Sequence, residues 1–523
     1  MNVFLMHEEQ PLERPGHLPA NQNDLIQDLE LETLLEAMAR GDELIFDVAR
    51  EVLLSASDDV EVALYRQAVL RDCLENRSVV QEMYQVASDA IQGERKIILG
   101  LFSRSPSAVL HRSIEVLEML VTMLGKLRQL AVASEGLFKS AGFTRLLTML
   151  EDELGPEYFA EVEGHLKELR FRDGVAMSVV LGAGNRGSGY VLRRAAEAKQ
   201  SWVQRVTGKA SPRYTLAIAD RDESGARALG ELRDLGIAIV ADALGRSTDH
   251  ILGFFETLRA ELAFYVGCVN LEEALAAKAG PICFPAVFPT GERRYSCRGL
   301  YDPCLALRVD GRLVGNDVAG DGKDLVMVTG ANQGGKSTFL RSVGVAQLMM
   351  QAGMFVPAEE LSAEMCKGLF THYRREEDRS MASGKLDEEL ARMSGIVDDL
   401  RAGCMVLLNE SFAATNEREG SEVAFQIVSA LVDSGVKVVF VTHLYEVARR
   451  FYDEESEAFL FLRAERLASG VRTFKVKEGA PLQTSYGEDL YRRLFSDGHL
   501  WGSVWHARGG GPLEAASGTY PRV

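Results

Sequence analysis

The sequence lacks the features that would place it in a membrane or in an oxidising compartment. It has no run of eighteen or more apolar residues, and residues 1–9 do not have the charged-then-apolar form of a signal peptide. Its seven cysteines include no C-x-x-C pair and their number is odd, which favours neither a disulfide framework nor a zinc site. We therefore expect a protein of a reducing, cytoplasmic compartment that has no membrane partner.

The chain also lacks an excess of positive charge. Lys and Arg number 58 against 76 Asp and Glu, so the formal net charge is −18 at pH 7 and would repel a polyanion on average. Any contact with nucleic acid must therefore come from a local basic surface.

With 523 residues, 46% of them hydrophobic and 26% charged, the sequence is typical of a globular protein. We expect roughly two to four domains.

The N-terminal part is expected to be helical. From about residue 24 to residue 150, apolar residues recur at steps of three and four, with few glycines or prolines. Between residues 174 and 245, glycines and short β-like runs at 215–218 and 237–240 interrupt this helical pattern. They predict an inserted segment that is not helical throughout. Helical patterning returns at about residues 250–277, as one long connecting helix.

From residue 280 onward, strands and helices alternate as in an α/β nucleotide-binding domain. The expected strands lie near 325–329, 404–408 and 436–441, and the expected helices near 336–351, 385–400 and 419–433. Glycines and other small residues after about residue 502 predict a disordered tail.

A phosphate-binding loop is the strongest motif. Residues 330–338 read GANQGGKST, which meets the G-x-x-x-x-G-K-[ST] pattern, and they directly follow an apolar run. Backbone N–H groups would curl around the phosphates, Lys336 would reach the β and γ oxygens, and Ser337 would hold Mg²⁺. The sequence therefore predicts ATP and Mg²⁺ as ligands. The predicted nucleotide-binding residues of the loop are Gly330, Ala331, Asn332, Gln333, Gly334, Gly335, Lys336, Ser337 and Thr338.

Two other strand ends supply candidates for hydrolysis, together with Lys336. Residues 405–408 are apolar and lead to Asn409 and Glu410, where a nucleotide site usually has Asp before the Glu. Glu410 is the candidate general base, and Asn409 is a candidate metal-side residue that can orient a water but brings no charge. His443, after another strand, could contact the γ-phosphate, although a lone histidine is more often structural. We expect slow but real ATP hydrolysis.

A further phosphate contact is predicted at Ser383 and Gly384, directly before an expected helix. Their free N–H groups could bind the nucleotide of a second subunit. A simple helix start explains the same residues equally well.

Residues 186–213 are basic, in contrast to the acidic chain as a whole: they contain seven basic residues and one acid, Glu197. Tyr190, Trp202 and Tyr214 lie among these cations, which suits contacts with a sugar-phosphate backbone. A solvated basic face is the alternative. The candidates for DNA contact are Arg186, Arg193, Arg194, Lys199, Arg205, Lys209 and Arg213.

Residues 329–358, which read TGANQGGKSTFLRSVGVAQLMMQAGMFVPA, closely resemble the nucleotide loop of the MutS family, whose members carry a TGPNMGGKST-type loop and a later FVPA. The order and spacing of further matches agree across roughly residues 281–495. These matches are Val314-Gly315-Asn316-Asp317, which is similar to the family's P-N-D adenine loop, Phe370-Thr371, Asn409-Glu410, Gly420, Thr442-His443 and Ser485-Tyr486-Gly487. The resemblance implies a dimeric ABC-type ATPase that encircles DNA, with Asn316 at the nucleotide and each ATP between two subunits.

The N-terminal half is similar to the family's core, lever and clamp. This similarity lies in the helical pattern with an inserted basic segment more than in individual residues. We expect the chain to lack the two extra N-terminal domains of a mismatch sensor, and we expect Phe254-Phe255-Glu256, which fits the F-x-E wedge, to pack in a helical core. Asn409 replaces the family's Asp, and Gln333 its Met. The fold class is thus multidomain α plus α/β. The expected domains are an N-terminal helical region at 1–105, a helical core and lever at 106–280 with a clamp-like insertion at about 176–245, a P-loop ATPase domain at 281–500 and a tail at 501–523.

Together these features predict a MutS-related, homodimeric DNA clamp in mismatch repair or recombination-related DNA maintenance. ATP binding and hydrolysis would change its grip on double-stranded DNA, mismatched or branched forms included, and the protein would be associated with the nucleoid. The alternative is an ATP-gated DNA-binding or protein scaffold with little hydrolysis, because Asn409 lacks a charge.

Overall fold

Two units make up the chain, and we call them the helical unit and the α/β unit. The computed structural model describes residues 1–12, 14, 18–55, 57–98, 105–171, 174–185, 187–193, 217–219, 221–311, 313–375, 384–467 and 471–482. The helical unit contains Met1–Leu18, Leu34–Ala274 and Gln351–Met354, and the α/β unit contains Pro19–Thr33, Leu275–Met350 and Phe355–Val523.

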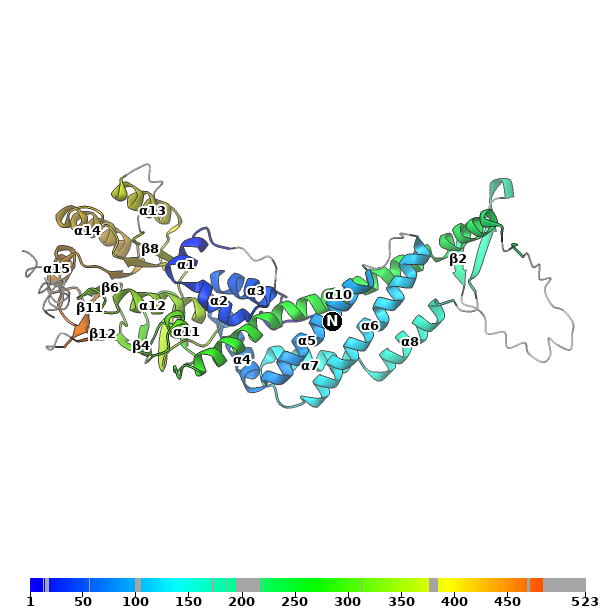
Figure 1. Ribbon diagram of the computed structural model, residues 1–523, viewed down its shortest axis with the longest axis horizontal. Helices are drawn as coiled ribbons and strands as arrows, with labels where there is room; N and C mark the ends of the chain where they lie inside the picture. The colour runs from blue at the N-terminus through cyan, green and yellow to red at the C-terminus, as the bar shows by residue number, and fades with distance from the viewer. Residues whose placement is uncertain are drawn as a thin grey trace, which may run out of the picture. The chain divides into compact units, whose positions relative to one another are not determined.

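In the helical unit, α5 packs against α6, and α6 packs against α7 and α8 (Figure 1). Polar side chains fix where these helices begin. Asp42 accepts the backbone N–H groups of Leu44 and Ile45 at the start of α3, and Ser105 caps α6 ahead of Pro106. The helices of this unit are α3 (Glu43–Leu54), α4 (Val60–Glu75), α5 (Arg77–Ile98), α6 (Pro106–Ala133), α7 (Ala141–Glu153), α8 (Pro156–Leu169) and most of α10 (Glu223–Ala276), and α2 (Leu31–Ala39) belongs in part to it.

The first residues of the chain lie inside the helical unit. Backbone N–H groups of Leu5, Met6 and Leu12 donate to the carboxylate of Glu261 in α10, at 2.6, 3.3 and 2.8 Å. Tyr265, one turn further along α10, donates its hydroxyl to the carbonyl oxygen of Leu5. Burial raises the pKa of Glu261 to about 7, against the opposing effect of these hydrogen bonds. The N-terminal segment is therefore part of the core of this unit.

The helix α10 is longer than the sequence predicts. It begins at Glu223, well before residue 250, and the predicted β-like run at 237–240 is wrong because these residues are helical. Ile237 is buried and Ile239 is exposed in this helix, and a four-residue apolar run cannot distinguish a strand from a helix by its period. Phe254 and Phe255 are buried here, which confirms the predicted core packing of the F-x-E match.

The predicted insertion contains a small antiparallel sheet. Its strands are β1 (Ala176–Leu181) and β2 (Gly187–Arg193), with a short 3₁₀ turn, η1 (Ala183–Asn185), between them. Of the other predicted β-like run, only residues 217 and 218 are described, and they belong to no strand.

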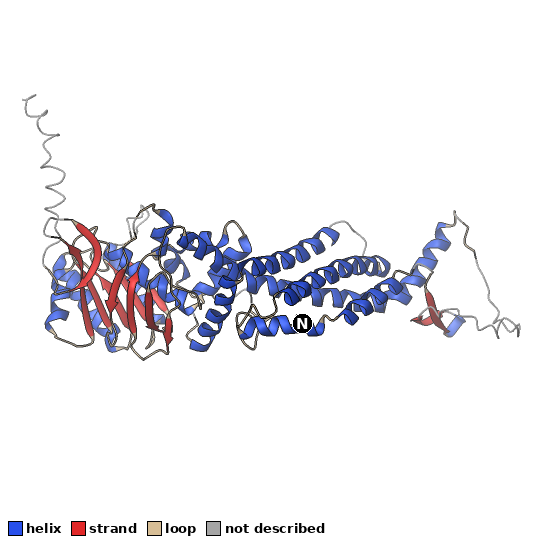
Figure 2. Ribbon diagram, turned by 90° about the horizontal axis from the view of Figure 1, so that it is seen from below, coloured by secondary structure: helices blue, strands red, loops and turns tan. Residues whose placement is uncertain are grey.

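The α/β unit is built on a six-stranded sheet, whose strands Figure 2 shows side by side. The strand order is β12-β11-β6-β10-β9-β8, in which only β12 runs antiparallel to its neighbour. These strands are β6 (Leu325–Thr329), β8 (Leu369–Tyr373), β9 (Met405–Asn409), β10 (Lys437–Val441), β11 (Phe459–Arg466) and β12 (Arg472–Glu478). Three of them confirm predicted strands, and all residues of β6, β8 and β10 are buried, as expected for parallel strands covered on both faces.

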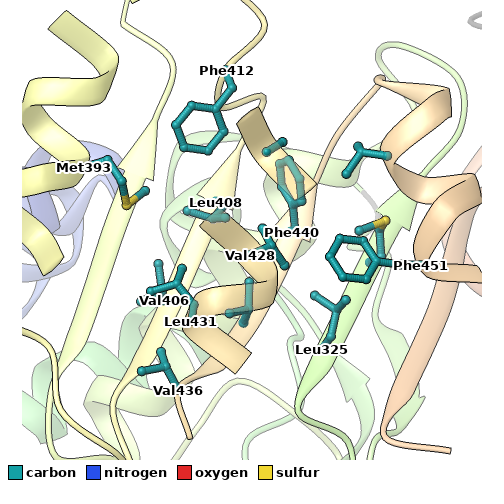
Figure 3. Close-up of a cluster of buried hydrophobic side chains, with 14 of the residues drawn as sticks. Leu325, Met393, Val406, Leu408, Phe412, Val428, Leu431, Val436, Phe440 and Phe451 are labelled. Atoms are coloured by element: carbon teal, nitrogen blue, oxygen red, sulfur yellow. The ribbon is translucent and has the colours of Figure 1, made fainter. Parts of the chain in front are cut away.

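The side chains of the central strands alternate between two apolar layers. Val406 and Leu408 of β9 and Phe440 of β10 face one core, together with Val428 of α14 and Phe451 of α15 (Figure 3). Leu407 points the other way, where Gly344 of α12 approaches it so closely that a methyl group there would lie 2.6 Å from Leu407 Cδ1. The helices of the unit are α1 (Gln22–Asp28), α11 (Pro303–Arg308), α12 (Lys336–Gln351), α13 (Lys385–Asp399), α14 (Glu417–Asp433) and α15 (Tyr445–Asp453).

A second sheet completes the α/β unit. Its strand order is β3-β7-β4-β5, with β3 (Ala286–Phe288), β4 (Tyr295–Leu300), β5 (Asn316–Ala319) and β7 (Glu360–Glu364). The segment Pro19–Thr33 packs in this unit as well, since Arg375 pairs with Asp24 and Asp28, and Arg341 with Glu30. No motif in the sequence predicts that such early residues belong to the α/β unit.

Candidate nucleotide site

The candidate site lies where the parallel strands end. The phosphate-binding loop follows β6, Asn409 ends β9 and Glu410 follows it, and His443 comes shortly after β10. In the sheet register Val441 of β10 is paired with both Val328 of β6 and Asn409 of β9, so the three strand ends are level. Ligands of open α/β sheets bind outside the carboxyl ends of the strands.

The loop before α12 has the conformation of a phosphate cradle. Gly330 and Gly335 have φ of 112° and 90°, which favours glycine, and a side chain at Gly334 would meet the carbonyl oxygen of Ala331 at 2.8 Å. The Nζ of Lys336 donates to the carbonyl oxygens of Gly330 and Ala331 at 3.1 and 3.3 Å. The loop is thus held in a ring around the buried ammonium group. Burial lowers the pKa of Lys336, while Glu410 acts to raise it.

The two candidate metal-side residues are in contact. The hydroxyl of Ser337 donates to Oδ1 of Asn409 at 2.9 Å. A hydroxyl and an amide oxygen are hard oxygen donors of the kind that suit Mg²⁺, which is usually bound by few protein ligands together with phosphate oxygens and water. These two oxygen donors therefore fit a Mg²⁺ ion that is also bound by a nucleotide. Because Asn409 stands in place of a carboxylate, the site has one negative charge fewer.

Glu410 contacts both Lys336 and His443. Its Oε1 is 3.9 Å from Lys336 Nζ, and its Oε2 contacts Nδ1 of His443. This hydrogen bond with Glu410 raises the pKa of His443, against the effect of burial. The three residues predicted to take part in hydrolysis are therefore brought together.

These residues line one open pocket of about 510 Å³. Its lining also contains Arg374, an exposed residue directly after β8 whose backbone N–H donates to the carbonyl oxygen of Asn409. The lining residues are Asn332, Gln333, Gly335, Lys336, Ser337, Thr338, Arg374, Glu410 and His443. Arg374 was not predicted from the sequence, although a cation that follows a parallel strand could have indicated it.

The edge strand β12 adds two side chains that no motif indicates. Arg472 donates to Oε1 of Gln333 in the phosphate-binding loop at 3.1 Å. Phe474 is half exposed and has φ of 60°, and its carbonyl oxygen would lie 3.3 Å from a side chain at Gly335. The predicted nucleotide residue Asn316 is buried and accepts the backbone N–H of Val476 in the same strand at 2.7 Å. Asn316 therefore holds β12 beside the loop.

The remaining predicted site residues are only partly described. Gly384 is the N-cap of α13, and no side chain caps this helix start. Ser383 lies outside the described residues, as does the match at residues 485–487. Arg193 ends β2, is exposed and donates to Oγ of Ser178 at 2.8 Å. The other DNA candidates, Arg186, Arg194, Lys199, Arg205, Lys209 and Arg213, lie outside the described residues, and so does the predicted tail at 501–523.

Comparison with known proteins matches both units. Residues 58–278 match the MutS2 N-terminal domain, and residues 326–492 match MutS domain V, an ATPase domain. The chain is 28% identical over 329 residues to the DNA mismatch repair protein MutS of Synechococcus sp. (strain CC9902), a match that covers 60% of this chain and 35% of that protein. It is 32% identical over 203 residues to the protein of the same name from Thermotoga maritima, covering 38% of this chain and 25% of that protein.

The chain thus spans about a third or less of the length of these relatives. Within the described residues, no helix is long and apolar enough to cross a membrane. The matched models fall in the same order along the chain as its helical unit and its α/β unit. The phosphate-binding loop, the Asn409-Glu410 pair and His443 all lie in the part that matches domain V. The chain belongs to the MutS family, with a MutS2-type N-terminal region followed by a domain V ATPase fold.

Proposed function

We propose that this protein is a DNA-binding ATPase that couples ATP binding and hydrolysis to its grip on DNA. The observation that carries the proposal is the convergence of Lys336, Glu410 and His443 beside the Ser337–Asn409 pair at level strand ends. Such a site positions phosphates and a water, which is most of what phosphoryl transfer needs from a protein. The relatives named for mismatch repair support a DNA target.

Each residue has a defined part in the proposed reaction. Mg²⁺-ATP, when bound, supplies the γ-phosphoryl group and a cation that offsets its charge. Lys336 would exchange its contacts with loop carbonyl oxygens for phosphate oxygens, and Glu410 would accept the proton of the attacking water. His443, whose pKa the hydrogen bond with Glu410 raises, would donate toward the γ-phosphate.

We also propose a homodimer with composite sites and a basic DNA surface. The uncapped N–H groups at Gly384 are suited to a phosphate, and that phosphate would belong to the nucleotide of a second subunit. The DNA surface would be the segment 186–213, which includes β2 and presents the exposed Arg193 at the end of that strand. Mismatch repair or recombination-related maintenance is the proposed process.

The test is binding of the purified chain to homoduplex, mismatched, branched and single-stranded DNA, with and without ATP, across a salt series. We expect binding that weakens as salt rises and that ATP changes, and no binding at low salt would refute the DNA role. Arg193→Glu together with Arg194→Glu should weaken binding and flatten the salt dependence. Lys336→Ala should reduce ATP affinity by roughly 30- to 100-fold, because it removes a charged hydrogen-bond donor.

A second candidate function follows from Asn409. An amide brings no charge to the metal side, which favours an ATP-gated scaffold with little hydrolysis. Steady-state turnover decides between the two, since a scaffold would bind ATP tightly and release almost no phosphate. We expect measurable turnover, because Glu410 and Lys336 are in place.

A further inference from the structure

The loop that carries Glu410 is held by buried polar groups that the proposed reaction does not use. Glu410 and Phe412 both have a left-handed backbone, with φ of 55° and 63°. This conformation is unfavourable for residues other than glycine and persists only where the surroundings fix it. Ser411 between them is fully buried, and so is Phe412. The turn therefore depends on its neighbours.

His372 of β8 is one of these neighbours. Its side chain is completely buried and stacks on the ring of Phe412, with ring centroids 5.4 Å apart. The hydroxyl of Ser411 lies 2.8 Å from Nδ1 of His372 and 2.6 Å from its carbonyl oxygen, and its single proton serves one of these acceptors at a time. In either arrangement Ser411 is joined to β8.

The other ring nitrogen of His372 reaches α13. Nε2 lies 3.0 Å from the carbonyl oxygen of Glu389, which can only accept, so Nε2 carries the proton. Burial, with a smaller contribution from Arg392, lowers the pKa of His372 to about 4. The ring is therefore neutral at neutral pH: Nε2 donates to the backbone of α13, and Nδ1 is an acceptor within reach of the Ser411 hydroxyl.

Glu389 makes a second connection from α13 to the same loop. Its side chain is buried. Burial raises the pKa of this carboxyl group, and a hydrogen bond with the backbone amide of Phe412 acts to lower it. The two residues that follow Glu410 are thus both attached to α13, one through His372 and the other directly.

We propose that His372 and Glu389 are positioning residues that fasten the loop of Glu410 to α13, so that this carboxylate is aimed at the γ-phosphate only while α13 is in place. The inference rests on the proposed ATPase function. Neither side chain lines the pocket at Lys336. Their loss should therefore slow turnover and leave nucleotide affinity almost unchanged.

The test compares Glu389→Ala with Glu389→Gln, and adds His372→Phe. The glutamine keeps an oxygen that can accept the Phe412 amide, and the phenylalanine keeps a stacked ring without hydrogen bonds. We expect kcat to fall about tenfold in Glu389→Ala and in His372→Phe, the change that one net hydrogen bond commonly produces. Glu389→Gln should stay within about threefold, and the Kd of a non-hydrolysable ATP analogue should stay within about twofold in all three.

Hydrogen exchange at the Phe412 amide gives a readout that does not need turnover. This amide should exchange about tenfold faster in Glu389→Ala than in Glu389→Gln. A chain that shows this difference but never hydrolyses ATP would refute the proposed ATPase and not the attachment of the loop to α13. Equal kcat and equal exchange in the alanine and glutamine variants would overturn the positioning role. If His372→Phe does not fold, the two Glu389 variants decide the question alone.

Discussion

Replacing Glu410 by Gln should stop ATP turnover without weakening ATP binding. The amide keeps the size of the side chain but cannot accept the proton of the attacking water. Loss of a positioned general base lowers a rate by about 10²- to 10⁴-fold. The contacts of Lys336 with the carbonyl oxygens of Gly330 and Ala331 do not involve Glu410, so the phosphate cradle is retained.

The electrostatics of the pair predict that ATP affinity is equal or higher in this variant. Lys336 Nζ lies 3.9 Å from Glu410 Oε1, and the two side chains are only 5% and 21% exposed. At an effective dielectric constant of about 20, opposite charges about 4 Å apart attract by about 4 kcal/mol. The γ-phosphate competes with this carboxylate for Lys336 and is repelled by it. The Glu410→Gln substitution removes both the competition for Lys336 and the repulsion of the γ-phosphate, each of which opposes ATP binding.

The assay is phosphate release under saturating ATP, combined with equilibrium binding of ATP. Glu446→Gln makes the same chemical change at an exposed position of α15 and should leave both quantities unchanged. Normal turnover in Glu410→Gln would show that another group is the base. Loss of ATP binding together with turnover would show that the carboxylate supports the loop structure and not proton transfer.

Three other predictions follow. Asn409→Asp should raise Mg²⁺ affinity or turnover, because a carboxylate beside the Ser337 hydroxyl offsets metal charge; a drop in both, measured by Mg²⁺ titration of ATP turnover, would show that the site is built around the amide. Phe474→Ala should weaken ATP binding by about two- to tenfold, because its half-exposed ring beside Gly335 of the phosphate-binding loop is available to stack on the base; an unchanged Kd would place the base elsewhere. Burial raises the pKa of Glu261 from 4.5 to about 7, so between these pH values the folded chain keeps a proton that the unfolded chain has released. The free energy of unfolding of the helical unit should therefore fall by about 3 kcal/mol as pH rises from 4.5 to above 7, and Glu261→Gln should flatten this change in urea denaturation.

The sequence predicts the parts of the α/β unit that depend on local pattern. Apolar runs that end in polar residues locate β6, β9 and β10, and the phosphate-binding loop follows from its glycines and Lys336. The contributions of Arg472 and Phe474 cannot be predicted in this way, because they depend on which strand pairs with β11. His372 has no motif either, since its role arises only where β8 meets α13.

In the helical unit too, local sequence pattern predicts some elements and misses others. The helices up to residue 150 follow from apolar spacing, and the insertion follows from its glycines. The early start of α10 is missed because the run at 237–240 is too short to fix a period. The place of the first residues is missed because hydrogen bonds between backbone groups and one distant carboxylate leave no periodic signal.

The attachment of the first residues to Glu261 has a consequence for the order of events during synthesis. Leu5 and Glu261 are 256 positions apart, so the core of the helical unit cannot close until α10 has been translated. At about 5–20 residues per second, a ribosome needs roughly 10–50 s to make that stretch. During this time the segment that contains Val3, Leu5 and Met6, all buried in the finished fold, can make its contacts with Tyr65 and Arg66 of α4 but not those with α10. The packing of the N-terminal segment is thus completed only when α10 emerges.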